Sequence, residues 1–151
     1  MDINKERGKK FIGVNCVFWC HDGQGNLLMH KRSKNCRDEQ ETWDCGAGSM
    51  EFSETFEDTI RREVLEEYGA EPKEIEYIAS ANVLREHNGQ KTHWVKNLHW
   101  VLVDPKDVKN NEPEKIEEIG WFTLDNLPTP LHSQIKIEVD MLKDFLAKKK
   151  I

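Results

Sequence analysis

The sequence has no long apolar run and no block of basic residues. Its longest unbroken apolar stretch, 16–20, has five residues, whereas a helix needs about 18 or more to cross a bilayer. The 28 acidic residues outnumber the 22 basic ones, which gives a net charge of -6, and a chain of that sign does not attract a nucleic-acid backbone. We therefore expect neither a membrane span nor a polymeric nucleic acid as a partner.

Signs of disulfides and of export are also missing. The four cysteines contain no C-x-x-C pair, and a chain of this length folds without disulfides, so we expect reduced thiols that pack as small core residues. A zinc site made of Cys16, Cys20, His21 and Cys36 would have a spacing that fits no common zinc finger. The charged segment 1–10 lacks the apolar part of a secretion signal, which favours the cytoplasm.

The order of the expected elements favours the α/β (α+β) class, and the length favours one domain over 1–151. Strands are expected at 9–20, 27–32, 75–85, 92–103 and 119–124, where β-branched and aromatic residues lie between turn residues. The third and fourth of these strands flank Asn88-Gly89, a hairpin signal, and should pair antiparallel. Helices are expected at 55–68 and from Ile135 onward. This order predicts a mixed sheet with helices on its faces.

The helix expected at 55–68 is the best defined element. It contains no glycine or proline, Ser53 and Thr55 are its candidate N-caps, and Gly69 is suited to end it. Its apolar residues recur at every fourth position. One stripe of the helix should therefore pack against the sheet.

Three acidic residues share one face of this helix. Glu63, Glu66 and Glu67 follow an i, i+3, i+4 spacing. Like charges so close repel one another, whereas a hard divalent cation with oxygen ligands turns the repulsion into attraction. The cluster favours a Mg²⁺ or Mn²⁺ site. The alternative is a solvated charged face, which is the commoner meaning of such a run when the helix is considered alone.

A segment that contains this helix resembles a known signature. Residues 48–70 read GSMEFSETFEDTIRREVLEEYGA. They are similar to the Nudix hydrolase signature, in which Gly, five residues, Glu and seven residues precede Arg-Glu-aliphatic-any-Glu-Glu-any-Gly-aliphatic. The matching positions are Gly48, Glu54, Arg62, Glu63, Val64, Glu66, Glu67 and Gly69. The departures are Ala70 for a larger aliphatic residue, Ser53 for a common Gly, and Ala47 for the first Gly of a common pair. So many positions at fixed spacing make the resemblance specific.

The resemblance implies a fold and a set of site residues. The fold is the Nudix-like α/β/α sandwich with a mixed central sheet. The implied ligands of Mg²⁺ or Mn²⁺ are Glu63, Glu66, Glu67 and the backbone carbonyl of Ala47. Arg62 and Glu54 are implied as residues that hold these ligands in position.

Water activation also requires a general base. Glu63 is one candidate, and the acidic segment EPEKIEE offers four more, namely Glu112, Glu114, Glu117 and Glu118. This segment precedes an expected strand, where similar family members often carry an additional catalytic or metal-binding Glu. On that resemblance we favour Glu117 or Glu114, against the alternative of a solvated loop acid.

The residues that would bind a substrate are less sharply indicated. Lys31, Arg32, Lys34 and Arg37 form the best candidate phosphate clamp. Rings that could stack on a base are Phe18, Trp19, Trp43, Trp94 and Trp100, most of them expected in the core. Phosphate contacts are also open to His30, His87, His93 and His99, although a structural histidine is commoner.

The expected function is metal-dependent hydrolysis of a pyrophosphate bond in a nucleoside diphosphate-linked substrate. A nucleoside triphosphate that yields a monophosphate is favoured, because the EPEK segment before Trp121 is similar to that of some triphosphate pyrophosphatases. The alternatives are an ADP-ribose, sugar-nucleotide or coenzyme A pyrophosphatase, an isopentenyl diphosphate isomerase-like enzyme, and a non-catalytic nucleotide-binding domain. The resemblance also makes a homodimer plausible.

Overall fold

The computed structural model describes residues 2–149. Its helices are α1 (Ile3–Glu6), α2 (Phe56–Tyr68) and α3 (Ile135–Lys149). Its strands are β1 (Gly13–His21), β2 (Leu27–Arg32), β3 (Trp43–Asp44), β4 (Gly46–Ser49), β5 (Glu74–His87), β6 (Gln90–Leu102) and β7 (Ile116–Phe122). The strands and helices expected from the sequence did not include α1, β3 or β4. The strand expected from Lys9 begins only at Gly13, because the preceding residues form a turn in which the Gly8 N–H donates to the Phe11 carbonyl at 2.8 Å.

Strand β1 is the centre of a mixed sheet. Along its whole length it pairs in parallel with β6, from Gly13 with Trp94 to His21 with Leu102. On its other edge the first half pairs antiparallel with β4, and His21 pairs with the start of β2. The main order is β3-β2-β1-β6-β5, with β7 beside β2. The mixed sheet and the antiparallel pairing of β5 with β6 confirm the prediction.

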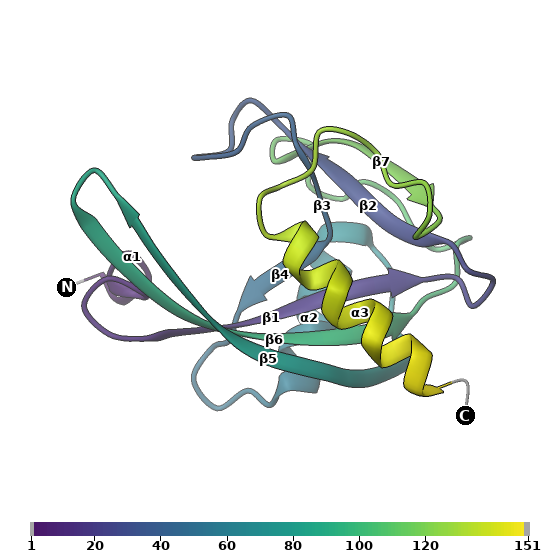
Figure 1. The fold of residues 1–151 in the computed structure, drawn as a ribbon, viewed down its shortest axis with the longest axis horizontal. Helices are drawn as coiled ribbons and strands as arrows, with labels where there is room; N and C mark the ends of the chain where they lie inside the picture. The colour runs from purple at the N-terminus through teal and green to yellow at the C-terminus, as the bar shows by residue number, and fades with distance from the viewer. Residues whose placement is uncertain (1, 150–151) are drawn as a thin grey trace.

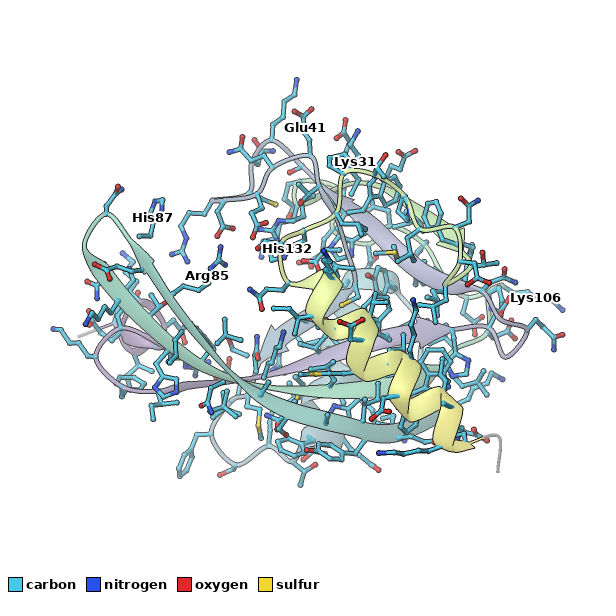
Figure 2. The ribbon with its side chains drawn as sticks, viewed as in Figure 1. Lys31, Glu41, Arg85, His87, Lys106 and His132 are labelled. Atoms are coloured by element: carbon cyan, nitrogen blue, oxygen red, sulfur yellow. The ribbon has the colours of Figure 1, made fainter. Side chains whose placement is uncertain are left out.

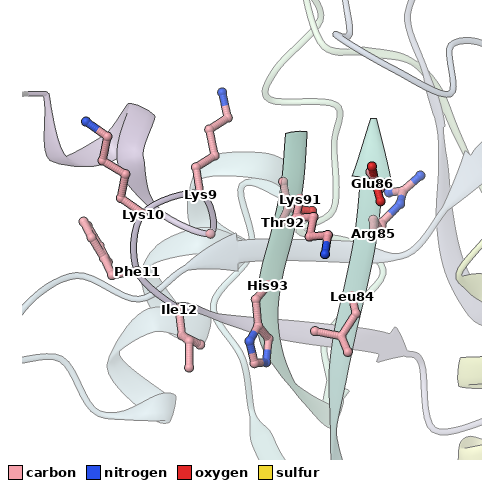
Figure 3. Close-up of a pocket in the computed structure, with 11 residues that line it drawn as sticks. Lys9, Lys10, Phe11, Ile12, Leu84, Arg85, Glu86, Lys91, Thr92 and His93 are labelled. Atoms are coloured by element: carbon pink, nitrogen blue, oxygen red, sulfur yellow. The ribbon is translucent and has the colours of Figure 1, made fainter. Parts of the chain in front are cut away.

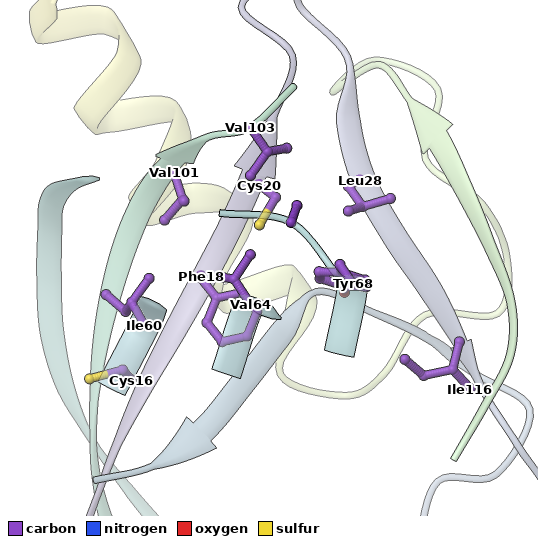
Figure 4. Packing of buried hydrophobic residues seen from close by; sticks show 11 residues of the cluster. Cys16, Phe18, Cys20, Leu28, Ile60, Val64, Tyr68, Val101, Val103 and Ile116 are labelled. Atoms are coloured by element: carbon purple, nitrogen blue, oxygen red, sulfur yellow. The ribbon is translucent and has the colours of Figure 1, made fainter. Parts of the chain in front are cut away.

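Two apolar clusters cover the two faces of this sheet, because successive residues of β1 point to opposite sides. Cys16, Phe18 and Cys20 belong to the cluster that includes apolar residues of α2 (Figure 4). Val17 and Trp19 belong to the cluster that includes apolar residues of α3. Figure 1 shows α3 in front of the sheet and α2 behind it. The arrangement is the α/β/α sandwich that the sequence predicted.

Both ends of α2 are set by its own sequence. The Asp58 N–H donates to Thr55 Oγ1 at 3.1 Å, and the Thr55 N–H donates to the Asp58 carboxylate at 3.0 Å. This reciprocal pair is a capping box, which makes Thr55 rather than Ser53 the N-cap. Gly69 ends the helix with a φ of 67°, a conformation that favours glycine.

The side chain of Phe18 on β1 lies against the backbone of Gly46, its partner on β4. A Cβ atom on Gly46 would lie 1.9 Å from the Phe18 ring, so glycine is required for this approach. The same short strand is followed, after a loop, by α2. The close packing therefore fixes the backbone from which the candidate site is built.

The β5–β6 hairpin projects beyond the body of the sandwich (Figure 1). It turns at Asn88 and Gly89, whose φ angles are 51° and 79°, as the sequence predicted. The thiols of Cys16, Cys20, Cys36 and Cys45 are free. Within residues 2–149, no helix combines the length and the apolar character that a membrane crossing requires.

Candidate active site

The acidic face of α2 lines a cavity of about 340 Å³, which we call the acidic cavity. Glu63, Glu66 and Glu67 line it from α2, and Ala47 and Gly48 line it from β4. The structure thus brings together the three glutamates and the alanine that the sequence predicted as metal ligands. Segments before β1 and between β6 and β7 complete the lining.

The absence of a side chain on Gly48 allows Glu63 to sit against β4. A Cβ atom at Gly48 would lie 2.1 Å from Cδ of Glu63 and 2.5 Å from its Oε1. Any larger residue would displace this carboxylate. Gly48 therefore shapes the acidic cavity directly, by leaving room for a side chain of α2.

Arg62 holds the carboxylates from one side. Its Nε and Nη2 donate to the two oxygens of Glu54 at 2.8 and 2.9 Å, and its Nη1 donates to Glu63 Oε1 at 2.6 Å. Its Nη2 also donates to the Ser49 carbonyl at 3.1 Å, which ties α2 to β4. The hydrogen bonds from Arg62 are the main reason why the pKa of Glu54 falls to about 2. Arg62 and Glu54 thus occupy positions suited to orienting the cluster.

Glu67 has a buried carboxylate oxygen without a partner. Its Oε2 atom accepts no hydrogen bond from any residue in 2–149. Burial raises the pKa of Glu67 well above its ordinary value, and the neighbouring Glu63 and Glu112 raise it further. Burial also raises the pKa of Glu63, although Arg62 opposes this shift. A buried carboxylate is costly unless a proton or a cation neutralises it, so the cavity is suited to a positively charged ligand.

The carboxylates of the acidic cavity are not arranged so that they could bind one metal ion directly. Among the described residues, no group of three or more His, Cys, Asp or Glu side chains has an arrangement that could hold a metal ion. The contact of 2.6 Å between Arg62 and Glu63 engages one of the oxygens that such an ion would need. The donor set itself, carboxylates and a nearby backbone carbonyl, is the one that hard divalent cations prefer.

The loop acid beside the cluster is Glu112, not the favoured Glu117 or Glu114. Glu112 lines the acidic cavity, because Asn111 binds the end of α2: its N–H donates to the Glu67 carbonyl at 3.0 Å and its Nδ2 to the Glu66 carbonyl at 3.1 Å. Glu117 does not line this cavity, and its carboxylate lies 3.9 Å from Lys31 Nζ. The register of the loop against α2, which the sequence does not reveal, decides between these acids.

Two cations in the acidic cavity were missed by the sequence reasoning. Arg7, from the segment after α1, lines it and pairs with Glu51 at 3.0 Å, and Lys115 lines it from the loop before β7. Arg7 lies more than 40 positions before the acidic helix. No local pattern could have indicated that it reaches the same cavity.

A second cavity, of about 600 Å³, meets the acidic cavity at β4, because Ala47, Gly48 and Ser49 line both. We call it the second cavity. Arg37, Arg85 and His87 are among its lining residues, as are buried charged side chains from β6 and α3. Figure 2 shows Arg85 and His87 projecting from the hairpin on the side of the molecule where His132, also a lining residue, lies.

The predicted phosphate clamp is only partly assembled. Arg37 lines the second cavity. Lys31 and Arg32 line neither cavity, and Arg32 pairs with Asp38 at 3.0 Å and with Asp44 at 3.6 Å. Lys34 is exposed outside both cavities. Lys31 and Arg32 lie on β2, whereas Lys34 and Arg37 lie in the loop that follows it, so the four side chains do not gather at one site.

Trp43, one of the rings predicted to contact substrate, lines neither the acidic cavity nor the second cavity. It is 8% exposed, belongs to the core cluster against α3, and packs edge-on against Phe122 with ring centroids 5.1 Å apart. Of the five aromatic residues considered for base stacking, only Trp94 lines the second cavity. The strand alternation at β3 turns Trp43 inward.

The histidines have mainly structural contacts. His30 Nδ1 lies 2.5 Å from the Tyr68 hydroxyl, and burial lowers the pKa of His30 to about 3. His99 is buried, and His93 bonds Asn82 at 2.9 Å. Of the four histidines considered for phosphate contacts, only His87 lines the second cavity.

A third cavity, of about 580 Å³, lies between the segment before β1 and the β5–β6 hairpin (Figure 3). Phe11, Ile12 and Leu84 supply its apolar lining, and Lys9 and Lys10 are among its cations. None of its lining residues, among those described, comes from α2 or β4. It is therefore separate from the acidic cluster.

The sandwich and its acidic cavity define the class of protein, one built on a Nudix domain. A family model described as the NUDIX domain matches residues 9–144, so the chain belongs to the NUDIX family. Members of this family generally use divalent metal ions.

Known proteins extend the comparison. The MutT NUDIX hydrolase from Burkholderia pseudomallei is 26% identical, with a TM-score of 0.76, over 87% of this chain and 98% of that chain. The NUDIX domain of Shewanella oneidensis NrtR, solved with ADP ribose, shares the fold at 18% identity, with a TM-score of 0.69 over 97% of this chain and 94% of that one. The NAD-capped RNA hydrolase NudC of Pseudomonas aeruginosa is 33% identical over 103 residues, which are 68% of this chain and 34% of NudC. This chain thus matches about a third of the length of that curated relative.

Proposed function

We propose that the protein hydrolyses a pyrophosphate bond of a nucleoside triphosphate or a related nucleotide, with the help of Mg²⁺ or Mn²⁺, and releases a nucleoside monophosphate. The observation that carries this proposal is the unpartnered, buried Oε2 atom of Glu67 at the acidic cavity. A cation there would neutralise a carboxylate that the protein leaves without a hydrogen bond.

The residues that would hold the metal are Glu63, Glu66, Glu67 and the Ala47 carbonyl. They line one cavity and supply only oxygen donors. A bound metal would supply positive charge to the phosphate oxygens and lower the pKa of an attacking water. An acidic protein of net charge -6 needs such a cation to accept an anionic substrate.

Arg62 and Glu54 would act as positioning residues, since the guanidinium joins Glu54, Glu63 and the Ser49 carbonyl in one network. Glu112, which lines the acidic cavity from the loop before β7, would be the carboxylate that takes a proton from water. Glu63 remains the alternative base within α2.

The two adjoining cavities suit the two parts of a nucleotide. A diphosphate beside the acidic cluster would leave the nucleoside in the second cavity, because both cavities share the residues of β4. Trp94 offers a ring there, and Arg37 and Arg85 offer cations. The name of the NudC relative also makes a dinucleotide a candidate substrate, which the experiment below includes.

The test is a screen of nucleoside triphosphates, ADP-ribose, NAD, sugar nucleotides and coenzyme A with added Mg²⁺ or Mn²⁺, in which the products are identified. We expect a nucleoside monophosphate from the substrates that are cleaved, or adenosine 3′,5′-bisphosphate in the case of coenzyme A. Hydrolysis in heavy-oxygen water then identifies the phosphorus that is attacked. Isomer formation without release of phosphate or pyrophosphate would contradict the proposal, and so would tight nucleotide binding without metal-dependent cleavage.

The critical variant is Glu67→Gln, which should lower turnover at least ~100-fold, because it removes a charge from the metal site. Glu57→Gln is the matched control, since Glu57 is exposed in the first turn of the same helix and does not line the acidic cavity. Full turnover by Glu67→Gln across the whole panel would reject the proposed site.

A further inference from the structure

The second cavity contains a buried ion pair that the chemistry at α2 does not use. Lys96 on β6 and Glu138 on α3 both line it and are each 4% exposed. The Lys96 ammonium donates to Glu138 Oε2 at 3.1 Å and to Gln134 Oε1 at 3.2 Å. The Cys45 thiol donates to Glu138 Oε1 at 3.4 Å. The pair is thus held in a fixed orientation at the cavity wall.

Stability does not explain this pair. The desolvation of two charges offsets much of their attraction, and replacing a buried ion pair with apolar residues is often neutral or stabilising. Apolar residues would also suit the location, since Glu138 lies in α3 next to Val139 and within the same helix as Leu142, both core residues. A charged pair in such a position, with an open cavity beside it, points to a ligand with a polar edge.

A second carboxyl group faces the same cavity. Asp44 on β3 lines it, 3.6 Å from Arg32 Nη1. Burial raises the pKa of Asp44 to about 7, with the Glu138 carboxylate as a further cause. A hydrogen bond from an N–H group of a ligand would stabilise the ionised form of this carboxyl group. The cavity therefore presents one ammonium donor and two carboxyl acceptors from three separate elements.

The donor and acceptor pattern distinguishes the bases. Guanine presents an oxygen acceptor, O6, next to two N–H donors at N1 and N2, whereas adenine presents one donor and one acceptor on the same edge. Uracil has one donor between two acceptors, and cytosine has one amino donor. The ammonium of Lys96 has three N–H groups and uses two within the protein, which leaves one for an acceptor such as O6.

We propose that Lys96, Glu138 and Asp44 determine the base specificity of the enzyme, and that they select guanine. Lys96 donates to O6, and the carboxyl groups of Glu138 and Asp44 accept from N1–H and the N2 amino group. Adenine reverses the first two positions, since it would place its N6 amino donor against the Lys96 ammonium and its N1 acceptor against a carboxyl oxygen, so both contacts become unfavourable in a buried site. The inference rests on the proposed function only in taking the ligand to be a nucleotide.

Binding of nucleoside monophosphates to the full chain without metal tests this inference separately from catalysis. Calorimetry should give an affinity for GMP at least tenfold higher than for AMP, CMP or UMP. IMP, which has O6 and N1–H but lacks the amino group, should fall between GMP and AMP. Hydrolysis of GTP, ITP and ATP with Mg²⁺ should follow the same order in kcat/KM.

Variants assign the preference to these residues. Glu138→Gln and Asp44→Asn should each reduce the ratio of GMP to AMP affinity to threefold or less. Asp140→Asn, on the same helix but exposed, is the matched control and should keep the full ratio. If a single variant does not fold, the double variant Lys96→Met with Glu138→Leu replaces the whole pair by apolar side chains. It should fold with an unchanged or higher melting temperature and bind all four bases equally.

The outcomes separate the two proposals. Equal affinity for the four bases, an unchanged preference in the variants, or no binding of any monophosphate at millimolar concentration overturns the inference. Efficient hydrolysis without base preference also overturns it and leaves the proposed function standing. A guanine preference in binding without hydrolysis of any nucleotide supports the inference and contradicts the proposed function.

Discussion

The two adjoining cavities are built in different ways. The carboxylates of the acidic cavity come mostly from one helix turn and its neighbours, and the Arg62 network joins residues no more than 13 positions apart. The charged wall of the second cavity joins Asp44, Lys96 and Glu138, and the Lys96–Glu138 contact spans 42 positions. A local segment thus carries the groups suited to chemistry, and the tertiary fold assembles those suited to recognition.

This difference in construction would allow the groups suited to the reaction to stay the same while the residues suited to substrate recognition vary. A helix with fixed caps and fixed spacing keeps its carboxylates together wherever the helix is used. The second cavity depends on which residues three distant elements happen to present, so it can change without disturbing the helix. Substitutions in the two cavities should therefore affect turnover and base preference separately.

The largest effect is expected at the contact between β4 and α2. Gly48→Ala should lower kcat/KM about 10²-fold, because the added Cβ would lie 2.1 Å from Glu63 Cδ and displace that carboxylate. Gly46→Ala is the comparison, since its Cβ would instead meet the Phe18 ring at 1.9 Å and should mainly lower the melting temperature. Steady-state kinetics and thermal unfolding separate the two results. Normal kinetics for Gly48→Ala would show that the acidic cavity does not need this close approach.

The choice of loop acid is the next test. Glu112→Gln should lower kcat about 10–100-fold, because Glu112 lines the acidic cavity. Glu117→Gln should change kcat less than threefold, since Glu117 lies outside that cavity beside Lys31. The reverse ranking of the two variants would favour Glu117 as the general base.

Acid should weaken the core beside the acidic helix. Burial lowers the pKa of His30 to about 3 from an ordinary value of 6.5, so below pH 6.5 the unfolded chain binds a proton at this residue and the folded chain does not. The free energy of unfolding should then fall by up to ~1.4 kcal/mol per pH unit until the pH approaches the folded value. Urea unfolding at pH 7 and pH 5 should show a smaller loss for His30→Gln than for the natural chain. The exposed His87→Gln is the control, and an equal loss in all three proteins would contradict the assignment.

The smallest effect concerns the tryptophan that the sequence placed at the substrate. Trp43→Phe should lower the free energy of unfolding by about 1 kcal/mol, since Trp43 is 8% exposed and packs against Phe122. The KM for the nucleotide should change less than twofold. A large rise in KM with unchanged stability would instead show that Trp43 contacts the substrate.

Local patterns predicted much of the fold. The capping residues of α2, the glycine that ends it and the Asn88–Gly89 turn were all recognisable, because each depends on neighbours a few positions away. Strand β4 was not recognised, since its four residues, GAGS, have little strand preference and are held by pairing with β1. The same limit applies to α1, a single short turn.

By itself, the sequence determined the acidic face of α2 and the mixed sheet, because helical spacing and hydrophobic alternation are properties of short segments. The residues that brace the cluster and the sandwich were implied by the resemblance to the Nudix signature. Only the tertiary structure decided that Glu112 rather than Glu117 adjoins Glu67, that Trp43 lies in the core, and that Lys96 and Glu138 meet at the second cavity. These depend on loop register and on the packing of distant elements. Such long-range contacts arise from the combined burial of both sheet faces, which no local window of residues contains.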